Sequence, residues 1–211
     1  MVEETAKLRI LECCKKLSEH KLTVKGDVCS VRMDEGIMIS DPEIDMADIT
    51  EKDIRFVGKN DAQNALEALH LAIYAHREDV NAIVMNHAPF CVGIAKKLNA
   101  VPATLDDMAQ IIGHTAKVSP SDEVTDVLKT LTGRNACLIR NGGVIATGRT
   151  LDEAFTGSLV LEKGALCYVG SAIIGKPVKI GLFDAVLMRA VYKLKYSKKD
   201  QTAKLKEEQG G

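Results

Sequence analysis

Three side chains able to bind a metal or move a proton fall close together in this sequence: the carboxylate of Glu67, the imidazole of His87 and the thiol of Cys91. Zinc prefers these groups as ligands, and a carboxylate or an imidazole can also serve as a general acid or base. If the fold brings the three groups together, they form a Cys/His/Glu site. Whether they meet depends on the elements that carry them.

The surrounding stretch predicts a helix, a turn and a buried strand in succession. Apolar residues recur at steps of three and four over residues 66–74, which predicts an amphipathic helix. Residues 80–85 are apolar and partly β-branched, as in a strand covered on both faces. Asn86 and His87 follow directly, and α/β proteins commonly place their chemistry where a buried strand emerges.

Length, charge and cysteine usage predict a cytoplasmic protein of one domain. The chain has 211 residues, 28 basic and 29 acidic side chains, and a net charge of −1. This balance offers no general attraction to nucleic acid or to an anionic membrane. The 6 cysteines include no Cys-x-x-Cys pair and mostly lie in apolar segments, as reduced core residues of a cytosolic protein do. We expect no secretory leader and no membrane span, because no apolar run approaches ~20 residues.

Periodicity and turn residues predict the remaining elements. Helices are expected over residues 3–20, 91–98, 119–132, 151–169 and 182–194, with strands over 28–32, 36–40, 54–57, 113–118, 136–139 and 143–147. Asp61 is expected to cap the helix that carries residues 66–74, and Asn141-Gly142 to turn a hairpin. We expect a domain over residues 1–196 and a flexible charged tail over 197–211.

Several segments resemble the class II aldolase/adducin family, which includes the fuculose-phosphate and ribulose-phosphate type aldolases. Residues 70–84, followed by a polar strand end and a proline, are similar to the family pattern at His70, Ile73, Tyr74, Arg77, Asp79 and Val80. Segments 30–39 and 138–145 resemble its early hairpin and its Asn-His-Gly turn. The likeness covers nearly the whole chain. It implies a three-layer α/β/α sandwich with a mostly antiparallel central sheet.

The resemblance also marks three metal positions. Family aldolases hold zinc with three histidines, and the matching residues here are Met85, His87 and Gly142. Met85 offers a neutral thioether and Gly142 offers no side chain, whereas zinc takes imidazole, thiolate or carboxylate. The resemblance therefore implies a degenerate zinc site with His87 as its remaining ligand. We expect no cofactor; the alternative is a divalent metal at a rebuilt site.

Residues at the family's catalytic and phosphate-binding positions are changed as well. The acid/base glutamate of the family falls on Leu66. The neighbouring Glu67 is the candidate catalytic carboxylate that remains, but one step along a helix rotates its side chain by ~100° from the family position. The serine pair that holds phosphate in the family becomes Asn64-Ala65. The expected pocket residues are Asn64, Met85, Asn86, Cys91, Asn141 and Gly142.

Two segments near the start of the predicted sheet also differ from the family pattern. Residues 41–43 place two carboxylates where family members have a phosphate loop, and like charges repel. The family's Gly-Asn pair becomes Asp27-Val28 in the ungapped alignment, whereas one inserted residue aligns Gly26-Asp27 with it instead. Both alignments stay open at this point.

Two functions of different class follow. The first is a family member that has lost zinc-dependent sugar-phosphate cleavage and acts as a non-catalytic binding or assembly protein, comparable in kind to the adducin head domain. The alternative is an active sugar-phosphate lyase with a site rebuilt from His87, Glu67 or Cys91. A further possibility is a pocket that binds a small sugar-like molecule, neutral or cationic because of the acidic segment at residues 41–43.

The expected partner is a second copy of the chain. The resemblance implies a homo-oligomer, a cyclic tetramer in the family, with sites at subunit boundaries. The candidate boundary residues are His114, Tyr192 and Tyr196. Simple alternatives explain the histidines, because a lone histidine at a strand end is often hydrogen-bonded structure, and His70 shares its helix face with apolar residues.

Overall fold

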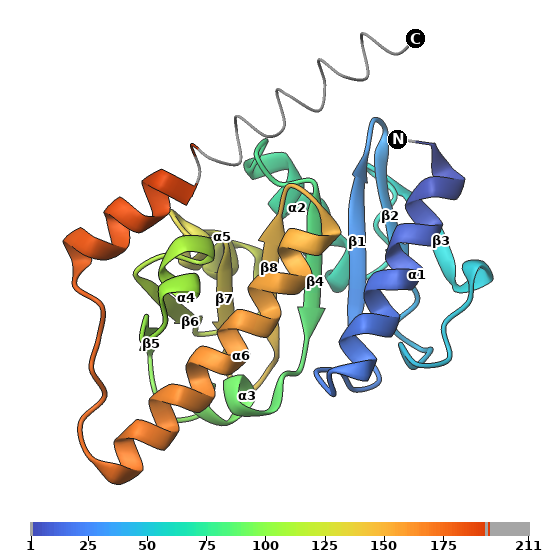
Figure 1. The fold of residues 1–211 in the computed structure, drawn as a ribbon. Helices are drawn as coiled ribbons and strands as arrows, with labels where there is room; N and C mark the ends of the chain where they lie inside the picture. Colours follow the sequence, from blue (N-terminus) through green and yellow to red (C-terminus); the bar gives the residue numbers. More distant parts are fainter. Residues whose placement is uncertain (1, 193, 195–211) are drawn as a thin grey trace, which may run out of the picture.

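A sheet of eight strands runs through the middle of the protein in a computed structural model that describes residues 2–192 and 194 (Figure 1). The strands are β1 (Val28–Met33), β2 (Gly36–Ser40), β3 (Ile54–Gly58), β4 (Ala82–Asn86), β5 (Ala100–Pro102), β6 (Thr115–Ser119), β7 (Ala136–Ile139) and β8 (Val144–Gly148). Their order across the sheet is β3-β2-β1-β4-β8-β7-β6-β5. Only β6 and β7 pair in parallel among the described strands, which confirms the predicted, mostly antiparallel sheet.

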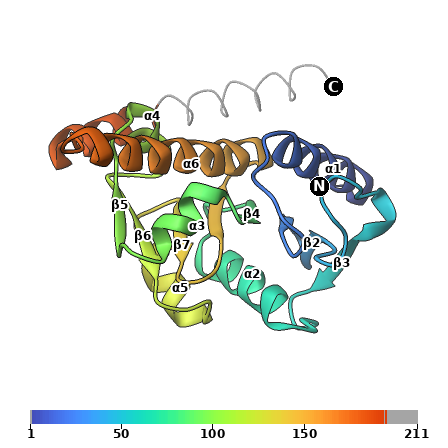
Figure 2. The same cartoon turned by 90° about the horizontal axis from the view of Figure 1, so that it is seen from below.

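Helices cover both faces of this sheet. They are α1 (Glu3–Glu19), α2 (Ala65–His76), α3 (Pro89–Ala95), α4 (Asp106–Ile111), α5 (Val124–Leu131) and α6 (Leu151–Ile174), and a 3₁₀ turn, η1, spans Glu51–Asp53. Figure 2 shows α1 and α6 on one face and α2 and α5 on the other. The arrangement confirms the predicted three-layer sandwich. A further helix, over residues 182–192, lies beyond α6.

Alternation along the strands supplies a separate apolar core to each helical layer. Cys29 and Val31 of β1 belong to the cluster that contains the buried residues of α1 and α6, whereas Val28 belongs to the cluster that contains those of α2 and α5. Side chains at successive positions of a strand point to opposite faces, so a continuous apolar run serves both cores. The reading of residues 80–85 as a strand covered on both faces is confirmed, with β4 at Ala82–Asn86.

Most predicted elements are confirmed within a few residues, and three predictions need correction. Asp61 does not cap α2: the N-cap is Asn64, whose side chain accepts from the backbone N–H of Glu67. The short strand β5 was missed, because three residues ending in a proline give too little periodicity. The long helix α6 continues to Ile174 instead of ending near residue 169. The predicted tail over 197–211 and Tyr196 lie outside the described residues.

Helix α6 is the one described helix that is long and apolar enough to cross a membrane, judged by length and composition alone. Its first half packs against the sheet, with Gly157, Val160, Leu161 and Gly164 among its buried residues. A core helix passes the same test, and the buried face of α6 is explained by the sheet it covers.

Candidate functional site

His87 stands directly after β4, and its imidazole is joined to a buried carboxylate. Its Nδ1 lies 2.5 Å from Oδ1 of Asp27, and its backbone N–H donates to Oδ2 of Asp27 at 3.1 Å. The same Oδ2 accepts from the backbone N–H of Val24 at 2.8 Å. Asp27 is 1% exposed, whereas the His87 side chain is 33% exposed. Asp27 immediately precedes β1, and the antiparallel pairing of β1 with β4 brings the two residues together.

The Asp27–His87 pair has a defined electrostatic character. The hydrogen bond to Asp27 raises the pKa of the His87 imidazole, and partial burial of the ring opposes that rise. A carboxylate at Nδ1 fixes the orientation of the ring and leaves Nε2 for any other partner. Nε2 accepts a hydrogen bond or a proton when the ring is neutral and donates one when it is protonated. The pair is therefore suited to proton transfer, or to holding a polar ligand.

Met85 lies in β4, two residues before His87, which stands just beyond the end of the strand. It pairs with Val28 of β1 and Ile145 of β8, and it packs against the core cluster that contains the buried residues of α2 and α5. Its thioether thus contributes to packing. No carboxylate, imidazole or thiol replaces the ligand that the family resemblance places here.

The turn between β7 and β8 lies beside the end of β4. We call the place where this turn meets His87 the His87 corner. Asn141 has φ of 57°, a left-handed conformation that asparagine tolerates, so the predicted hairpin at Asn141-Gly142 is confirmed. A Cβ atom on Gly143 would lie 2.3 Å from the Asn86 carbonyl oxygen and 3.3 Å from Cε1 of His87. The turn therefore lies directly against His87. The three positions that correspond to the family's metal ligands gather at this one corner.

The side chains at this corner do not fit a zinc ion. A catalytic zinc site needs three protein ligands and an open position. Of Met85, His87 and Gly142, only His87 carries a suitable group, and its Nδ1 is occupied by Asp27. Across residues 2–192 and 194, no group of three or more His, Cys, Asp or Glu side chains is arranged to hold a metal ion.

Glu67, the predicted catalytic carboxylate, is instead hydrogen-bonded at the N-terminal end of α2. It is 2% exposed, and its Oε1 accepts from the Arg55 guanidinium and from Nδ2 of Asn64. Its Oε2 accepts from the backbone N–H of Gln63 at 2.8 Å. Three donors therefore hold this carboxylate, and the described structure contains no hydrogen bond or ion pair between Glu67 and His87. Both Glu67 and the predicted pocket residue Asn64 stabilise the start of the helix.

Cys91 and Asn86, two further pocket predictions, are held by α6. The backbone N–H groups of Phe90 and Cys91 donate to the Glu162 carboxylate at 2.8 and 2.9 Å, which caps the start of α3. Burial raises the pKa of the Cys91 thiol, and the neighbouring Glu162 adds to the effect. Asn86 is completely buried and accepts from the Ser158 hydroxyl at 2.9 Å. Glu67, His87 and Cys91 thus belong to three separate networks, and the structure does not form the Cys/His/Glu group.

His70 is buried in the core, as its helix face predicts. Its Nδ1 lies 2.8 Å from the Ser30 hydroxyl, which also lies 2.8 Å from the Tyr74 hydroxyl. Its Nε2 has no hydrogen-bond partner, and burial lowers the pKa of His70 from 6.5 to about 4. The ring is therefore neutral in the folded protein at neutral pH.

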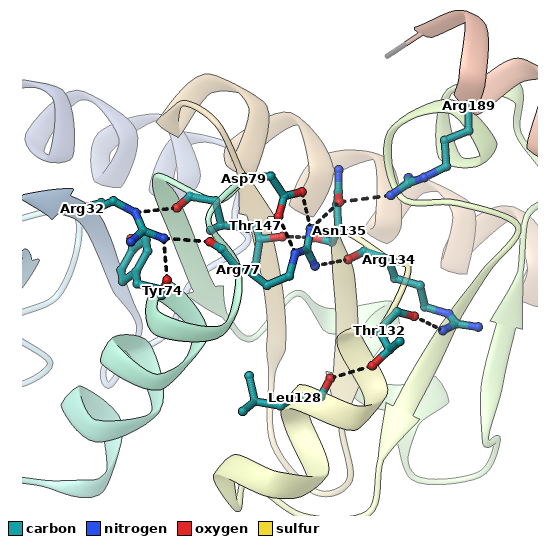
Figure 3. Close-up of polar contacts among 11 residues, drawn as sticks. Arg32, Tyr74, Arg77, Asp79, Leu128, Thr132, Arg134, Asn135, Thr147 and Arg189 are labelled. Carbon is teal, nitrogen blue, oxygen red and sulfur yellow. Dashed lines mark hydrogen bonds and ion pairs between the residues drawn. The ribbon is translucent and has the colours of Figure 1, made fainter. Parts of the chain in front are cut away.

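The predicted boundary residues lie at the far end of the sheet. Tyr192 lines a cavity of about 200 Å³ together with Arg77, Asn135 and Arg149. Arg77 and Arg189 both donate to Oδ1 of Asn135, at 3.3 and 3.1 Å (Figure 3).

His114 lines a second cavity of about 220 Å³, against the helix over residues 182–192. Its Nδ1 lies 2.9 Å from the hydroxyl of Thr115. His87 does not line either of these two cavities. Their role at a subunit boundary stays a prediction, and Tyr196 lies outside the described residues.

Asp27 lies at this site but was not among the pocket residues expected from the sequence. The alignment with one inserted residue could have indicated Asp27, because it places this residue at the position of the family's asparagine. In the structure Gly26 has φ of 106°, a conformation that glycine allows, and the carboxylate of Asp27 reaches His87.

Comparison with protein families gives one match over most of the chain. Residues 8–169 match the family described as the Class II Aldolase and Adducin N-terminal domain.

Curated relatives and solved structures agree with that match. A 5-methylthioribulose-1-phosphate/5-deoxyribulose-1-phosphate aldolase of Rhodospirillum rubrum is 31% identical over 160 residues, covering 70% of this chain and 72% of the relative. An L-fuculose phosphate aldolase of Escherichia coli is 27% identical over 186 residues, covering 82% and 86%. A solved L-fuculose 1-phosphate aldolase superposes with a TM-score of 0.85 at 25% identity, covering 92% of this chain and 98% of that one.

Proposed function

Because the chain belongs to the class II aldolase and adducin family, we propose that it uses the family fold as a binding or assembly protein and has lost zinc-dependent cleavage of sugar phosphates. The observation that carries this proposal is the donor set at the corner of His87. One imidazole remains where the family has three, and its Nδ1 is bound to Asp27. The carboxylate nearest the family's acid/base position, Glu67, is held by Arg55, Asn64 and Gln63.

An assembly role is supported by a large apolar surface near the end of the described chain. We call it the C-terminal apolar surface. It comprises Leu182, Phe183, Val186, Leu187 and Val191, which recur at helical spacing on the helix over residues 182–192 and are each more than half exposed. Monomeric proteins rarely expose contiguous apolar patches larger than a few hundred Å². We infer that a second copy of this chain covers the surface in a cytoplasmic homo-oligomer.

A second candidate function is an active sugar-phosphate lyase that works at His87. The named activities of the relatives favour it, and so does one observation in this structure: a buried carboxylate orients the imidazole and raises its pKa, as a general acid/base requires. Under this alternative His87 exchanges a proton with the substrate through Nε2, and Asp27 acts as a positioning residue. The ligand is then a small sugar-like molecule bound at the corner of β4 and the β7–β8 turn.

Metal content and cleavage activity, measured on the same preparations, separate the two functions. The first proposal predicts no stoichiometric divalent metal by mass spectrometry and no release of aldehyde from short ketose phosphates. It is wrong if the wild type carries near one equivalent of metal that His87→Ala loses and His76→Ala, a change at an exposed histidine, retains. Cleavage that is lost in His87→Ala but kept in His76→Ala, with or without bound metal, establishes the second function instead.

A gain-of-function variant serves as the positive control. The double substitution Met85→His and Gly142→His restores an imidazole at each family position, and His87 supplies the third. At Gly142 an added Cβ would lie 2.9 Å from Cγ2 and 3.1 Å from Cβ of the buried Ile139, so the turn must move slightly to accept the histidine. We expect this variant to bind zinc, and the same variant with His87→Ala to bind it far more weakly.

A further inference from the structure

Three buried thiols meet where α1 packs on β1. Cys13 and Cys14 are consecutive residues of α1, and Cys29 lies in β1. The Sγ atoms of Cys13 and Cys29 are 3.7 Å apart, and Cys14 lies close enough to contribute to the raised pKa of the Cys29 thiol. A disulfide has an S–S distance of ~2.0 Å, so the Cys13–Cys29 pair is within a small movement of bonding.

Cys13 also borders a cavity that opens between α1 and the start of α6. The cavity has a volume of about 270 Å³, and the charged residues that line it are Arg9, Glu12, Lys16 and Asp152. Lys16 pairs with Asp152 at 3.0 Å and also interacts electrostatically with Cys13. Cys14 and Cys29 are both completely buried, so Cys13 is the thiol that a small oxidant meets first.

We propose that Cys13 and Cys29 form an oxidative modification site, at which hydrogen peroxide produces an intramolecular disulfide. In the first step Cys13 Sγ attacks peroxide, an S–O bond forms, the O–O bond breaks, and a sulfenic acid and water result. In the second step Cys29 Sγ attacks the oxidised sulfur, the S–S bond forms and the S–O bond breaks. The departing hydroxide takes the Cys29 proton as a second water. The two thiols lose two electrons and one peroxide becomes two waters.

The order of these steps follows from the surroundings of the two sulfurs. Burial raises the pKa of the Cys29 thiol, which keeps it protonated until the activated Cys13 sulfur lies beside it. A metal-binding role for the three thiols is not supported, because they form no group arranged to hold an ion. Cys29 is two residues from Asp27, so the disulfide ties α1 to the strand that enters the His87 corner.

Peptide mapping of the oxidised folded protein tests the proposal directly. The purified full chain is treated with hydrogen peroxide, remaining thiols are alkylated, and the unreduced tryptic digest is analysed by mass spectrometry. We expect a cross-link between residues 10–15 and 26–32 that dithiothreitol removes and that Cys13→Ser and Cys29→Ser both abolish. Because trypsin leaves Cys13 and Cys14 in one peptide, the bond is assigned with Cys14→Ser, which is expected to retain the cross-link.

Two results overturn the proposal. One is a folded wild-type protein that forms no cross-link between these peptides under peroxide. The other is a bond assigned to Cys14, or to the exposed Cys167 of another molecule, in place of Cys13. If Cys14→Ser does not fold, fragmentation of the wild-type peptide between residues 13 and 14 makes the same assignment.

Discussion

At the scale of single residues, the chemistry of His87 depends on a partner 60 positions away in the sequence. A histidine at the end of a strand can take either tautomer and turn its ring freely. The buried carboxylate of Asp27 removes that freedom, because it binds both Nδ1 and the backbone N–H of His87. The pair is one unit, and a role in binding or in proton transfer belongs to both residues.

Removing the carboxylate is therefore expected to change the titration of His87. In Asp27→Asn the hydrogen bond to a charged acceptor is lost while partial burial of the ring remains, so the pKa of His87 should fall. The chemical shift of the imidazole C–H protons, followed by NMR across the pH range, measures this value. Asp34→Asn, at an exposed aspartate in the β1–β2 turn, is the control that should leave the titration unchanged. An unchanged pKa in Asp27→Asn would show that the pair does not form in solution.

His70 makes the folding stability depend on pH. Its pKa is about 4 in the folded protein and 6.5 as an ordinary value, so between these limits the unfolded chain binds more protons than the folded chain. This contribution to stability is fully present above pH 6.5 and is lost as the pH falls toward 4. A shift of this size corresponds to about 3 kcal/mol.

Urea unfolding of the wild type and of His70→Gln isolates this contribution. Other groups titrate in the same window, and taking the difference between the two proteins removes them. We expect the advantage of the wild type over the variant to shrink between about pH 7 and about pH 5. A difference that stays constant with pH would mean that His70 is not buried in its neutral form.

At the scale of elements, Arg32 ties β1 to the end of α2. Its Nη2 donates to the carbonyl oxygens of Tyr74 and Arg77 at 2.6 and 2.7 Å, and its Nε donates to that of Val80 at 2.9 Å (Figure 3). The last carbonyl groups of a helix have no partner within the helix. One guanidinium therefore satisfies the end of α2 and fixes where β4 begins.

Arg32→Lys is expected to destabilise the protein although it keeps the charge. An ammonium group cannot reproduce the planar set of donors that reaches three carbonyl oxygens, so we expect a loss of about 2–3 kcal/mol. Chemical unfolding monitored by circular dichroism measures the loss. Arg9→Lys makes the same chemical change at an exposed position of α1 and should have little effect. Equal stability of both variants would contradict the role given to Arg32.

The elements themselves were largely predictable because their signals are local. The Asn141-Gly142 turn and the helical spacing of residues 66–74 act over a few positions, and the structure contains both. The cap of α2 was misassigned because Asp61 and Asn64 are both good capping residues. The choice between them depends on where Glu67 and Arg55 meet, which is a tertiary contact.

At the scale of the whole molecule, the sequence predicted the architecture but only part of the site. The place of His87 directly after β4 was predictable, since a polar residue after a buried strand is visible without a structure. The partners of its side chains were not predictable, because Asp27 reaches His87 through strand pairing and Glu162 reaches Cys91 from α6. Hence a Cys/His/Glu group that looked possible in the sequence divides into three networks in the fold.

The C-terminal apolar surface gives the last prediction, which concerns assembly. The helix over residues 182–192 is docked through Ala185, which is 1% exposed, and through Arg189, while Phe183 and Leu187 are 80% and 54% exposed. Sedimentation velocity should show the wild type as an oligomer, and Phe183→Glu with Leu187→Glu should shift it toward the monomer, because burying two carboxylates in an apolar interface is costly. Leu8→Glu introduces one carboxylate at an exposed apolar residue of α1 and should leave the oligomer intact. A monomeric wild type, or equal dissociation by both variants, would show that this surface does not join copies of the chain.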